Sequence, residues 1–443
     1  MKRILIIILA ALLSLGWIFA VKGEIGSEVS YSKTIKQAQE SVSDELYEQG
    51  VELYNKALEM KPGNNKLYVD IKEAYKLYDK EQGSTDSRKK YINSLIKCTE
   101  IFPKSKEYWV EIIKIYMDDE DYRNANTYIK KALNFEIKDD YIDASKKKID
   151  YIYTERATGF EEYLYKPKTN SGSFGEIYIV KDENGYKMLS NSGDDASDIY
   201  TYIGIPNDKG EALYIDKSGM TVKDSKFITR HKLTGTVDKA GEISENLIPV
   251  CSGDSWYYID LTGKKVLGDY EYATSFVNKM AAVKESGSWF IINQKGQKQD
   301  GLVFSDIKLS LSNSYVHNGE LILAKKDKKY SIYNTEFKKV GDFSCADIDI
   351  YTGEPIAFSN GTNWGFVNEK GKVVLEPKFT SAKSFSNGYA AFLDNSGLWG
   401  FCNKNFDTAI SGAFASGGYF DSNERCVVEF VEDTLMTIEF KYR

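Results

Sequence analysis

The chain has 443 residues and a formal net charge of −7, so it is longer than one compact core and favours two or three domains. The acidic balance argues against a sequence-independent nucleic-acid binder, which needs a basic face. Two histidines leave little room for histidine-based metal sites or catalytic triads. The 32 tyrosines suit half-buried β-surfaces and binding faces alike.

Residues 1–23 form the first predicted element. Lys2 and Arg3 precede an apolar run from Ile4 to Val21, which is just long enough to span a bilayer as a helix. The two cations place its N-terminus inside and the rest of the chain outside. We interpret it as a membrane anchor or, alternatively, as a signal peptide that is cleaved on export, although no A-x-A cleavage pattern and no cysteine for lipidation stand nearby.

Residues 31–157 have few glycines and an apolar period near 3.6, which predicts a row of helices. The clearest helical pair lies between Tyr108 and Phe135, around a turn at residues 118–121. Its first face carries Trp109, Ile112, Ile113 and Tyr116, and its second face carries Tyr122, Ala125, Ile129 and Ala132. This pattern resembles a tetratricopeptide repeat, except that Ile113 replaces the glycine of the repeat.

Two further units of this kind end at Pro62 and Pro103, and a Lys-rich helix with Ile149 forms a cap. An insertion at residues 81–88 is expected to lengthen one turn. Arrays of such units have a concave surface, which we expect to hold an extended peptide or a partner helix. The alternative is a stalk or an assembly surface, because the residues that the pattern places belong to the inter-helix core.

Residues 172–443 have a different texture, with glycine turns and alternating β-branched or aromatic residues that predict strands. Short strands recur with a mean spacing of about 37 residues. Their expected starting positions are Tyr178, Ala212, Trp256, Trp289, Tyr330, Trp364 and Trp399, with a last strand from Leu435 to Phe440. The region therefore carries an internal β-repeat.

The pairs Trp364-Gly365 and Trp399-Gly400 make this region resemble WG repeats, which are named after that dipeptide. At Trp256 and Trp289 the glycine is replaced by an aromatic residue, and the three other copies lack the tryptophan. Members of this family are often bacterial surface or envelope proteins with helical repeats attached. The resemblance therefore implies binding rather than a known chemistry.

The expected fold is multidomain α + β: an N-terminal helix, a tetratricopeptide-like α-solenoid and an all-β repeat domain. One β-unit cannot bury both of its faces, so neighbours must stack on it, either in a closed propeller or in an open β-solenoid. Seven units and a C-terminal strand that completes the first favour a seven-bladed propeller, which hides strand edges. The tryptophans and the Ser-Phe pairs are then expected in the core between blades.

No residue pattern predicts catalysis, a cofactor or a metal site. His231 and His317 lie in polar, turn-like stretches without a neighbouring nucleophile. The oxygen-rich stretch 190–198 lacks the spacing of a calcium loop and is interpreted as a solvated loop, with a weak cation site as the alternative. The five cysteines have no metal-ligand spacing and are expected to be small buried residues rather than disulfides.

These observations predict an extracytoplasmic, non-enzymatic scaffold without cofactors. We expect a protein or peptide partner at the helical repeats, a second protein or a cell-wall glycan at the β-domain, the membrane at the N-terminal helix, and no nucleic acid. One alternative is a glycan-active enzyme that uses carboxylates at a propeller mouth. Another is a structural spacer.

Overall fold

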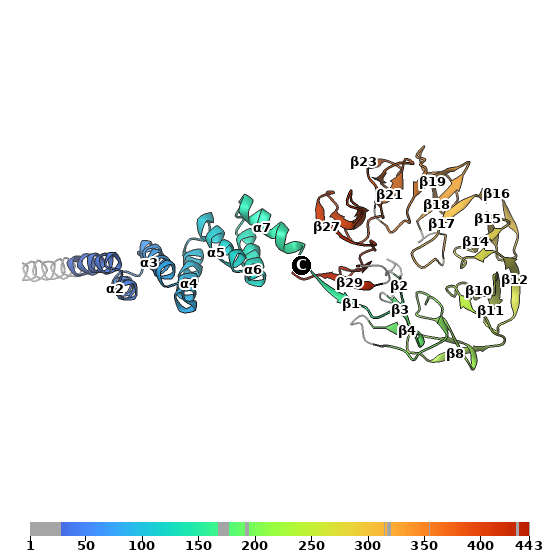
Figure 1. The fold of residues 1–443 in the computed structure, drawn as a ribbon, viewed down its shortest axis with the longest axis horizontal. Coiled ribbons are helices and arrows are strands. Elements are labelled where there is room, and N and C mark those ends of the chain that lie inside the picture. The colour runs from blue at the N-terminus through green and yellow to red at the C-terminus, as the bar shows by residue number, and fades with distance from the viewer. Residues whose placement is uncertain are drawn as a thin grey trace, which may run out of the picture. The chain divides into compact units, whose positions relative to one another are not determined.

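The structure is a computed structural model that describes residues 28–166, 177–190, 195–313, 315–316, 320–353, 355–430 and 434–442. It divides into two compact units, one of Met1–Ile152 with Tyr442–Arg443 and one of Tyr153–Lys441. The first is helical and the second is built of strands (Figure 1).

The predicted anchor at residues 1–23 lies outside the described residues. Within the part that is described, no helix is both long and apolar enough to cross a membrane. The helical region was expected to extend to residue 157, but residues 153–157 form a strand of the second unit.

The helical unit is a row of helices in which each helix packs against the next along the chain. Its helices are residues 28–43, α2 (Tyr47–Met60), α3 (Lys66–Gln82), α4 (Thr85–Ile101), α5 (Lys106–Asp118), α6 (Tyr122–Asn134) and α7 (Asp140–Asp150). These seven helices fit helical repeats, as the sequence predicted. The predicted turn between Asp118 and Tyr122 is confirmed.

The expected long turn at residues 81–88 is wrong, because α3 and α4 extend into it. Gly83 ends α3 with a φ of 57°, a left-handed conformation that glycine adopts without strain. Ser84 then begins α4 with a capping box, in which its side chain accepts the backbone N–H of Ser87 at 3.1 Å. The C-cap of α3 and the N-cap of α4 are therefore adjacent residues, and the turn between the two helices is tight.

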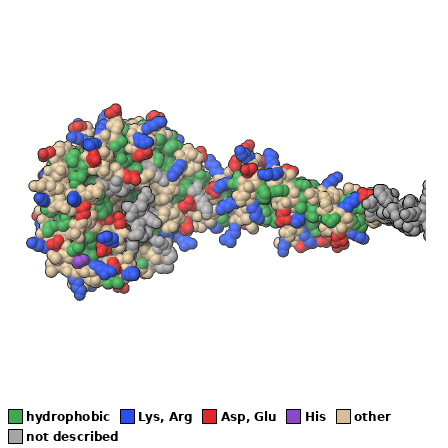
Figure 2. Space-filling view, turned by 180° about the vertical axis from the view of Figure 1, so that it is seen from behind, with side chains coloured by type: hydrophobic (Ala, Val, Ile, Leu, Met, Phe, Trp, Pro, Cys, Tyr) green, Lys and Arg blue, Asp and Glu red, His purple; other side chains and the backbone are tan. Residues whose placement is uncertain are grey.

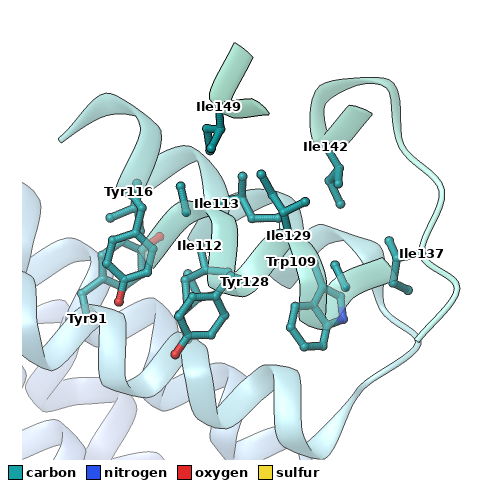
Figure 3. Close-up of a cluster of buried hydrophobic side chains, with 14 residues drawn as sticks. Tyr91, Trp109, Ile112, Ile113, Tyr116, Tyr128, Ile129, Ile137, Ile142 and Ile149 are labelled. Atoms are coloured by element: carbon teal, nitrogen blue, oxygen red, sulfur yellow. The ribbon is translucent and has the colours of Figure 1, made fainter. Parts of the chain in front are cut away.

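The core of the helical unit consists of the aromatic and aliphatic side chains that the sequence placed on facing helices (Figure 3). Trp109 is 2% exposed, and its indole N–H donates to the Pro103 carbonyl at 2.9 Å. Tyr116 and Tyr128 stack with their ring centroids 5.5 Å apart. Ala125 is fully buried, and its small side chain lets α5 and α6 approach closely.

In its described residues, the β-unit is a propeller of eight small antiparallel sheets, or blades, arranged in a ring (Figure 1). Blade 1 contains β2 (Glu162–Lys166), β3 (Ile177–Asp182) and β4 (Gly185–Leu189); blade 2, β5 (Tyr202–Ile203), β6 (Ala212–Asp216), β7 (Gly219–Lys223) and β8 (Thr229–Leu233); blade 3, β9 (Lys239–Ala240), β10 (Leu247–Ser252), β11 (Ser255–Asp260) and β12 (Lys265–Tyr270); blade 4, β13 (Tyr272–Ala273), β14 (Met280–Glu285), β15 (Ser288–Asn293) and β16 (Lys298–Phe304). Blade 5 contains β17 (Asp306–Lys308), β18 (Leu321–Lys326) and β19 (Lys329–Asn334); blade 6, β20 (Asp347–Ile348), β21 (Ile356–Ser359), β22 (Trp364–Val367) and β23 (Val373–Phe379); blade 7, β24 (Ser381–Ala382), β25 (Tyr389–Leu393), β26 (Trp399–Asn403) and β27 (Thr408–Phe414); blade 8, β28 (Arg425–Glu429), β29 (Leu435–Phe440) and β1 (Tyr153–Ala157).

The expectation of seven blades is therefore wrong, and that of a propeller is confirmed. The last strand, β29, does not complete the first blade; it is the central strand of blade 8, between β28 and β1. All five residues of β1 pair antiparallel with β29, from Tyr153 opposite Phe440 to Ala157 opposite Met436. The ring is thus closed by pairing its first strand in the sequence with its last.

The miscount comes from the last strand, because the seven expected starting positions fall one in each of blades 1 to 7 and the strand from Leu435 belongs to an eighth blade. The copies also differ in phase. The copies that begin at a tryptophan start on the third strand of a blade, whereas those at Tyr178 and Ala212 start on the second strand, β3 or β6. Without a tryptophan, both strands of the hairpin show the same alternation of apolar and polar residues. The strand from Leu435 is in phase with the tryptophan copies and marks the eighth blade.

The tryptophans occupy equivalent positions, each opposite an aromatic residue of the outermost strand. These cross-strand pairs are Trp256 with Tyr270, Trp289 with Phe304, Trp364 with Phe379, and Trp399 with Phe414. The Ser-Phe pairs point their phenylalanines, Phe276 and Phe385, into the core, where each is 1% exposed. The predicted aromatic core is confirmed for these phenylalanines and for Trp289, whereas Trp256, Trp364 and Trp399 are only partly buried.

Candidate functional site

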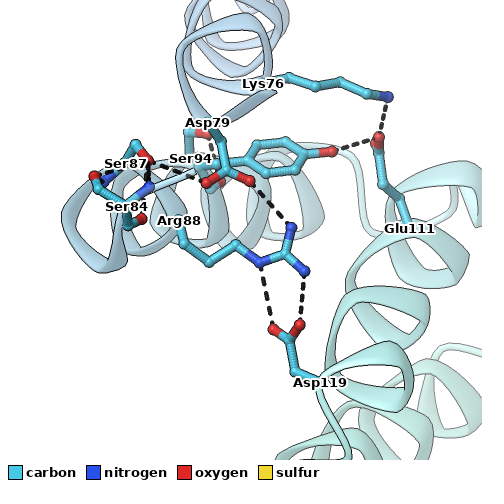
Figure 4. A network of polar contacts seen from close by, with 9 residues as sticks. Lys76, Asp79, Ser84, Ser87, Arg88, Ser94, Glu111 and Asp119 are labelled. Atoms are coloured by element: carbon cyan, nitrogen blue, oxygen red, sulfur yellow. Dashed lines mark hydrogen bonds and ion pairs between the residues drawn. The ribbon is translucent and has the colours of Figure 1, made fainter. Parts of the chain in front are cut away.

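In the helical unit, a polar network joins three consecutive helices (Figure 4). Lys76 of α3 and Tyr91 of α4 both donate to the Glu111 carboxylate of α5. Arg88 of α4 contacts Asp79 at 3.0 Å and Asp119 at 2.9 Å. These charges hold the helices together.

Opposing effects act on the pKa of the Glu111 carboxyl in this network. Burial by itself would raise the pKa of its carboxyl, but the hydrogen bonds from Lys76 and Tyr91 and the charges of Lys72 and Lys76 together outweigh burial and lower that pKa. The carboxylate is therefore ionised and fully engaged at neutral pH. It serves as a link between helices.

Near the axis of the propeller, tyrosines reach carboxylates across an intervening blade. The Tyr419 hydroxyl, just before blade 8, donates to Asp349 of blade 6 at 2.8 Å, and the Ser384 N–H of blade 7 donates to the same carboxylate at 2.6 Å. Tyr315 of blade 5 is similarly bonded to Glu242 of blade 3. In a ring, a contact that skips a blade must lie near the axis, so these carboxylates are occupied where a propeller mouth would need free ones.

The seam between blades 1 and 8 is held by a second buried polar cluster. Tyr178 donates to the Asp421 carboxylate at 2.5 Å and accepts from the Arg425 guanidinium at 2.6 Å. Arg425 also contacts Asp421 at 3.2 Å. The adjoining cavity measures about 30 Å³, so it is too small for any ligand beyond a water-sized molecule.

A groove of about 690 Å³ lies between blades 1 and 2. Its wall is preorganised, because Tyr186 and Tyr200 exchange backbone N–H···O bonds of 2.8 and 2.9 Å. Gly185, at a φ of 137°, permits this approach, since a Cβ there would lie 2.5 Å from the Tyr200 carbonyl oxygen. The Ile199 side chain, 49% exposed, gives the wall an apolar patch.

Two aspartates hold equivalent positions on this groove, at the ends of β3 and β6. Asp182 accepts the N–H of Asn184 at 2.8 Å, and Asp216 accepts that of Ser218 at 2.7 Å. These hydrogen bonds, from the Asn184 backbone and from the Ser218 hydroxyl and backbone, lower the pKa of both carboxyls. In the sequence both aspartates begin an Asp-x-x-Gly turn, a spacing that hairpin geometry explains without a ligand.

A second groove, of about 430 Å³, is lined by residues of blades 2 and 3, among them Asn207, Glu211, His231 and Glu245. His231 lies on the strand β8 and not in the expected turn, and its side chain is exposed. Glu211 accepts from Asn207 at 3.1 Å, and Glu245 accepts the Lys279 N–H at 2.9 Å. The polar groups of this groove are therefore partly engaged with one another. His317 lies outside the described residues.

The other candidate residues from the sequence do not come together in one site. In the stretch 190–198, residues 191–194 are outside the described part, and Asp195 pairs with Lys187 at 3.0 Å. Across the described residues, no group of three histidine, cysteine or acidic side chains has metal-binding geometry. All five cysteines are buried and free, as expected, and burial raises the pKa of Cys98 to about 11 and that of Cys345 to about 12.

Known structures share only coarse similarity with the chain. One is Hsv2 of Kluyveromyces lactis, with 12% identity and a TM-score of 0.35 over 55% of this chain and 95% of that one. Another is an inactive virginiamycin B lyase of Staphylococcus aureus, with 10% identity and a TM-score of 0.35 over 65% and 99%. The Sgt2 TPR domain of Aspergillus fumigatus has 20% identity and a TM-score of 0.20 over 27% and 79%. These scores are too low to carry an argument.

Comparison with curated proteins gives no match. The family model of the WG containing repeat matches residues 258–289 and 364–396. The first match runs from β11 into the start of β15, and the second from β22 to just before β26. Each match therefore extends from the third strand of one blade to that of the next, and the β-unit of this chain carries WG containing repeats.

Proposed function

We propose that the protein is a non-enzymatic binding scaffold that acts outside the cytoplasm. Its helical repeats engage a protein or peptide, and its propeller presents grooves to a second partner, either a protein or a cell-wall polymer. The N-terminal segment holds it at the membrane or directs its export. A WG-repeat propeller joined to helical repeats is consistent with such a scaffold.

One observation carries the proposal. The carboxylates near the propeller axis, Asp349 and Glu242, are bonded to tyrosines, whereas the wide groove between blades 1 and 2 opens at the surface with ionised aspartates and an exposed Ile199. Groups that are paired internally support stability, and groups on an open, preorganised groove favour binding. This contrast also weighs against the glycan-active enzyme, which needs two free carboxylates facing a substrate.

In vivo photocrosslinking tests the proposal. A benzoylphenylalanine at Ile199 in the groove should yield a discrete adduct, and the same residue at Val374, an exposed position on β23 of blade 6, should not. Protease added to intact cells should degrade the protein if it lies outside the cytoplasm. Adducts of equal yield at both positions, or none at either, would contradict the scaffold and favour a spacer.

A further inference from the structure

We propose that the groove between blades 1 and 2 binds an extended, lysine- or arginine-rich segment of a protein partner. This inference rests on the proposed function and names its site and the chemistry of its partner. Charge, wall composition and the position of the groove on the ring carry the argument.

The groove has an excess of negative charge. Four carboxylates, those of Glu161, Asp182, Glu183 and Asp216, line it together with the ammonium groups of Lys181 and Lys217. Lys181 contacts Glu161 at 3.0 Å and Glu162 at 3.4 Å, and Lys187 contacts Asp182 at 3.5 Å and Asp195 at 3.0 Å. Each of these two lysines thus faces two carboxylates, and the excess of negative charge remains. Complementary charge therefore favours a cationic partner and repels an acidic one.

The aspartates are also fixed in place before a partner arrives. One oxygen of Asp182 and one of Asp216 is held by the turn that follows it. A partner that contacts them pays little ordering entropy. The apolar patch of Ile199 beside these charges matches lysine and arginine, whose aliphatic stems cover apolar surface while their charged ends reach carboxylates.

The equivalent positions on the other blades are mostly not acidic. The last residue of the second strand is Ser252 in blade 3, Glu285 in blade 4, Lys326 in blade 5, Ser359 in blade 6 and Leu393 in blade 7. Glu285 is in addition neutralised by Lys298 at 2.5 Å. The same position is acidic on the consecutive blades 8, 1 and 2, as Glu429, Asp182 and Asp216. A row of carboxylates on neighbouring blades suits an extended segment with several cations.

The test measures binding of the full-length protein to arrayed nonapeptides that range from acidic to basic. The double variant Asp182→Asn/Asp216→Asn removes both charges but keeps an oxygen that accepts the turn N–H. A control variant, Asp300→Asn/Glu336→Gln, removes the same charge from exposed positions on blades 4 and 5. Purified muropeptides form a parallel arm.

We expect the protein to select basic peptides, and the double variant to bind them about tenfold more weakly, because each exposed charge contact contributes a factor of a few. The control should bind like the parent. Equal binding by parent and double variant, or equal losses in the double variant and the control, would overturn the groove assignment without touching the scaffold. Binding of muropeptides alone would overturn the cationic partner, and binding of neither ligand would overturn this proposal while the photocrosslinking result decides on the scaffold.

Discussion

In blades 7 and 3 the third strand and the outermost strand approach closely at a glycine, but this glycine lies on opposite strands in the two blades. In blade 7, Gly400 follows the tryptophan, and a Cβ there would lie 2.5 Å from the Ile410 carbonyl oxygen of the outermost strand. In blade 3, Tyr257 stands at that position, and the glycine is found opposite it, at Gly268, where a Cβ would lie 2.5 Å from the Tyr257 Cβ. The requirement is thus for space between two strands, not for glycine at one position of the sequence.

The comparison explains why the repeat looks degenerate while its fold is regular. Blade 6 follows blade 7, since a Cβ at Gly365 would lie 2.4 Å from the Leu375 carbonyl oxygen. Where an aromatic residue replaces this glycine, a lysine of the outer strand covers its ring: Lys265 lies 4.8 Å from the Tyr257 centroid and Lys298 lies 3.7 Å from that of Phe290. Four experiments test this account.

The largest effect is expected from replacing the aromatic residue that lies opposite the tryptophan, which is Phe414 in blade 7 and Tyr270 in blade 3. Phe414 is fully buried opposite Trp399, so Phe414→Ala should cost about 3–5 kcal/mol of unfolding free energy. Tyr270→Ala, at the half-buried equivalent in blade 3, should cost clearly less. Urea unfolding of the full chain measures both, and equal losses would mean that the two blades are not packed as described.

Gly268→Ala should cost about 3 kcal/mol, because it adds a clash with Tyr257 to a strained φ of 125°. Tyr257→Gly should relieve the clash but leave the strain. A double-mutant cycle by urea unfolding should therefore show favourable coupling between the two changes. If the unfolding free energies of the two substitutions simply add, Gly268 does not make room for Tyr257 and the comparison with Gly400 fails.

Gly400→Ala should cost about 1–3 kcal/mol, since the added methyl group would force the outer strand of blade 7 to move. Gly63→Ala is the matched control, because a Cβ at Gly63 meets nothing within 4 Å. Differential scanning calorimetry should show a lower Tm for the first variant. Unchanged Tm values in both would show that the close approach in blade 7 is not a constraint.

Lys298→Met should have the smallest effect, about 0.5 kcal/mol, because it keeps most of the aliphatic stem and removes the charge above the Phe290 ring. Lys338→Met, on a turn of blade 5 beside Glu336, serves as the control for a lost surface charge. Urea midpoints measure both. If Lys298→Met lowers the stability no more than Lys338→Met does, the charge of Lys298 contributes nothing and only its aliphatic stem stabilises the Phe290 ring.

The sequence predicted the parts of the fold that rest on local pattern. Trp364-Gly365 and Trp399-Gly400 marked their strands correctly, and the alternation around Trp109 and Ala125 placed the helical pair. The blade number failed at the strand from Leu435, because its partners, Arg425–Glu429 and the distant Tyr153–Ala157, are not marked by any repeat pattern. At Tyr178 and Ala212 only the phase was missed, because alternation alone does not tell the two strands of a hairpin apart.

The candidate groove was not predictable for a different reason. Asp182 and Asp216 are turn residues in any single copy, and only the placing of blade 1 beside blade 2 brings them to one groove. The contact between Tyr419 and Asp349 likewise joins residues 70 positions apart. Such pairs depend on the closed ring, which no local pattern encodes.

The pairing of β1 with β29 also sets the order in which the ring is able to close during folding. β1 precedes every other strand of the ring in the sequence, but its partner from Leu435 to Phe440 follows all of them. Blades 1 to 7 contain only contiguous segments and are able to fold as these segments become available, whereas blade 8 must await β29. Until then β1 exposes an unpaired edge, which makes this interval the period of greatest risk of aggregation.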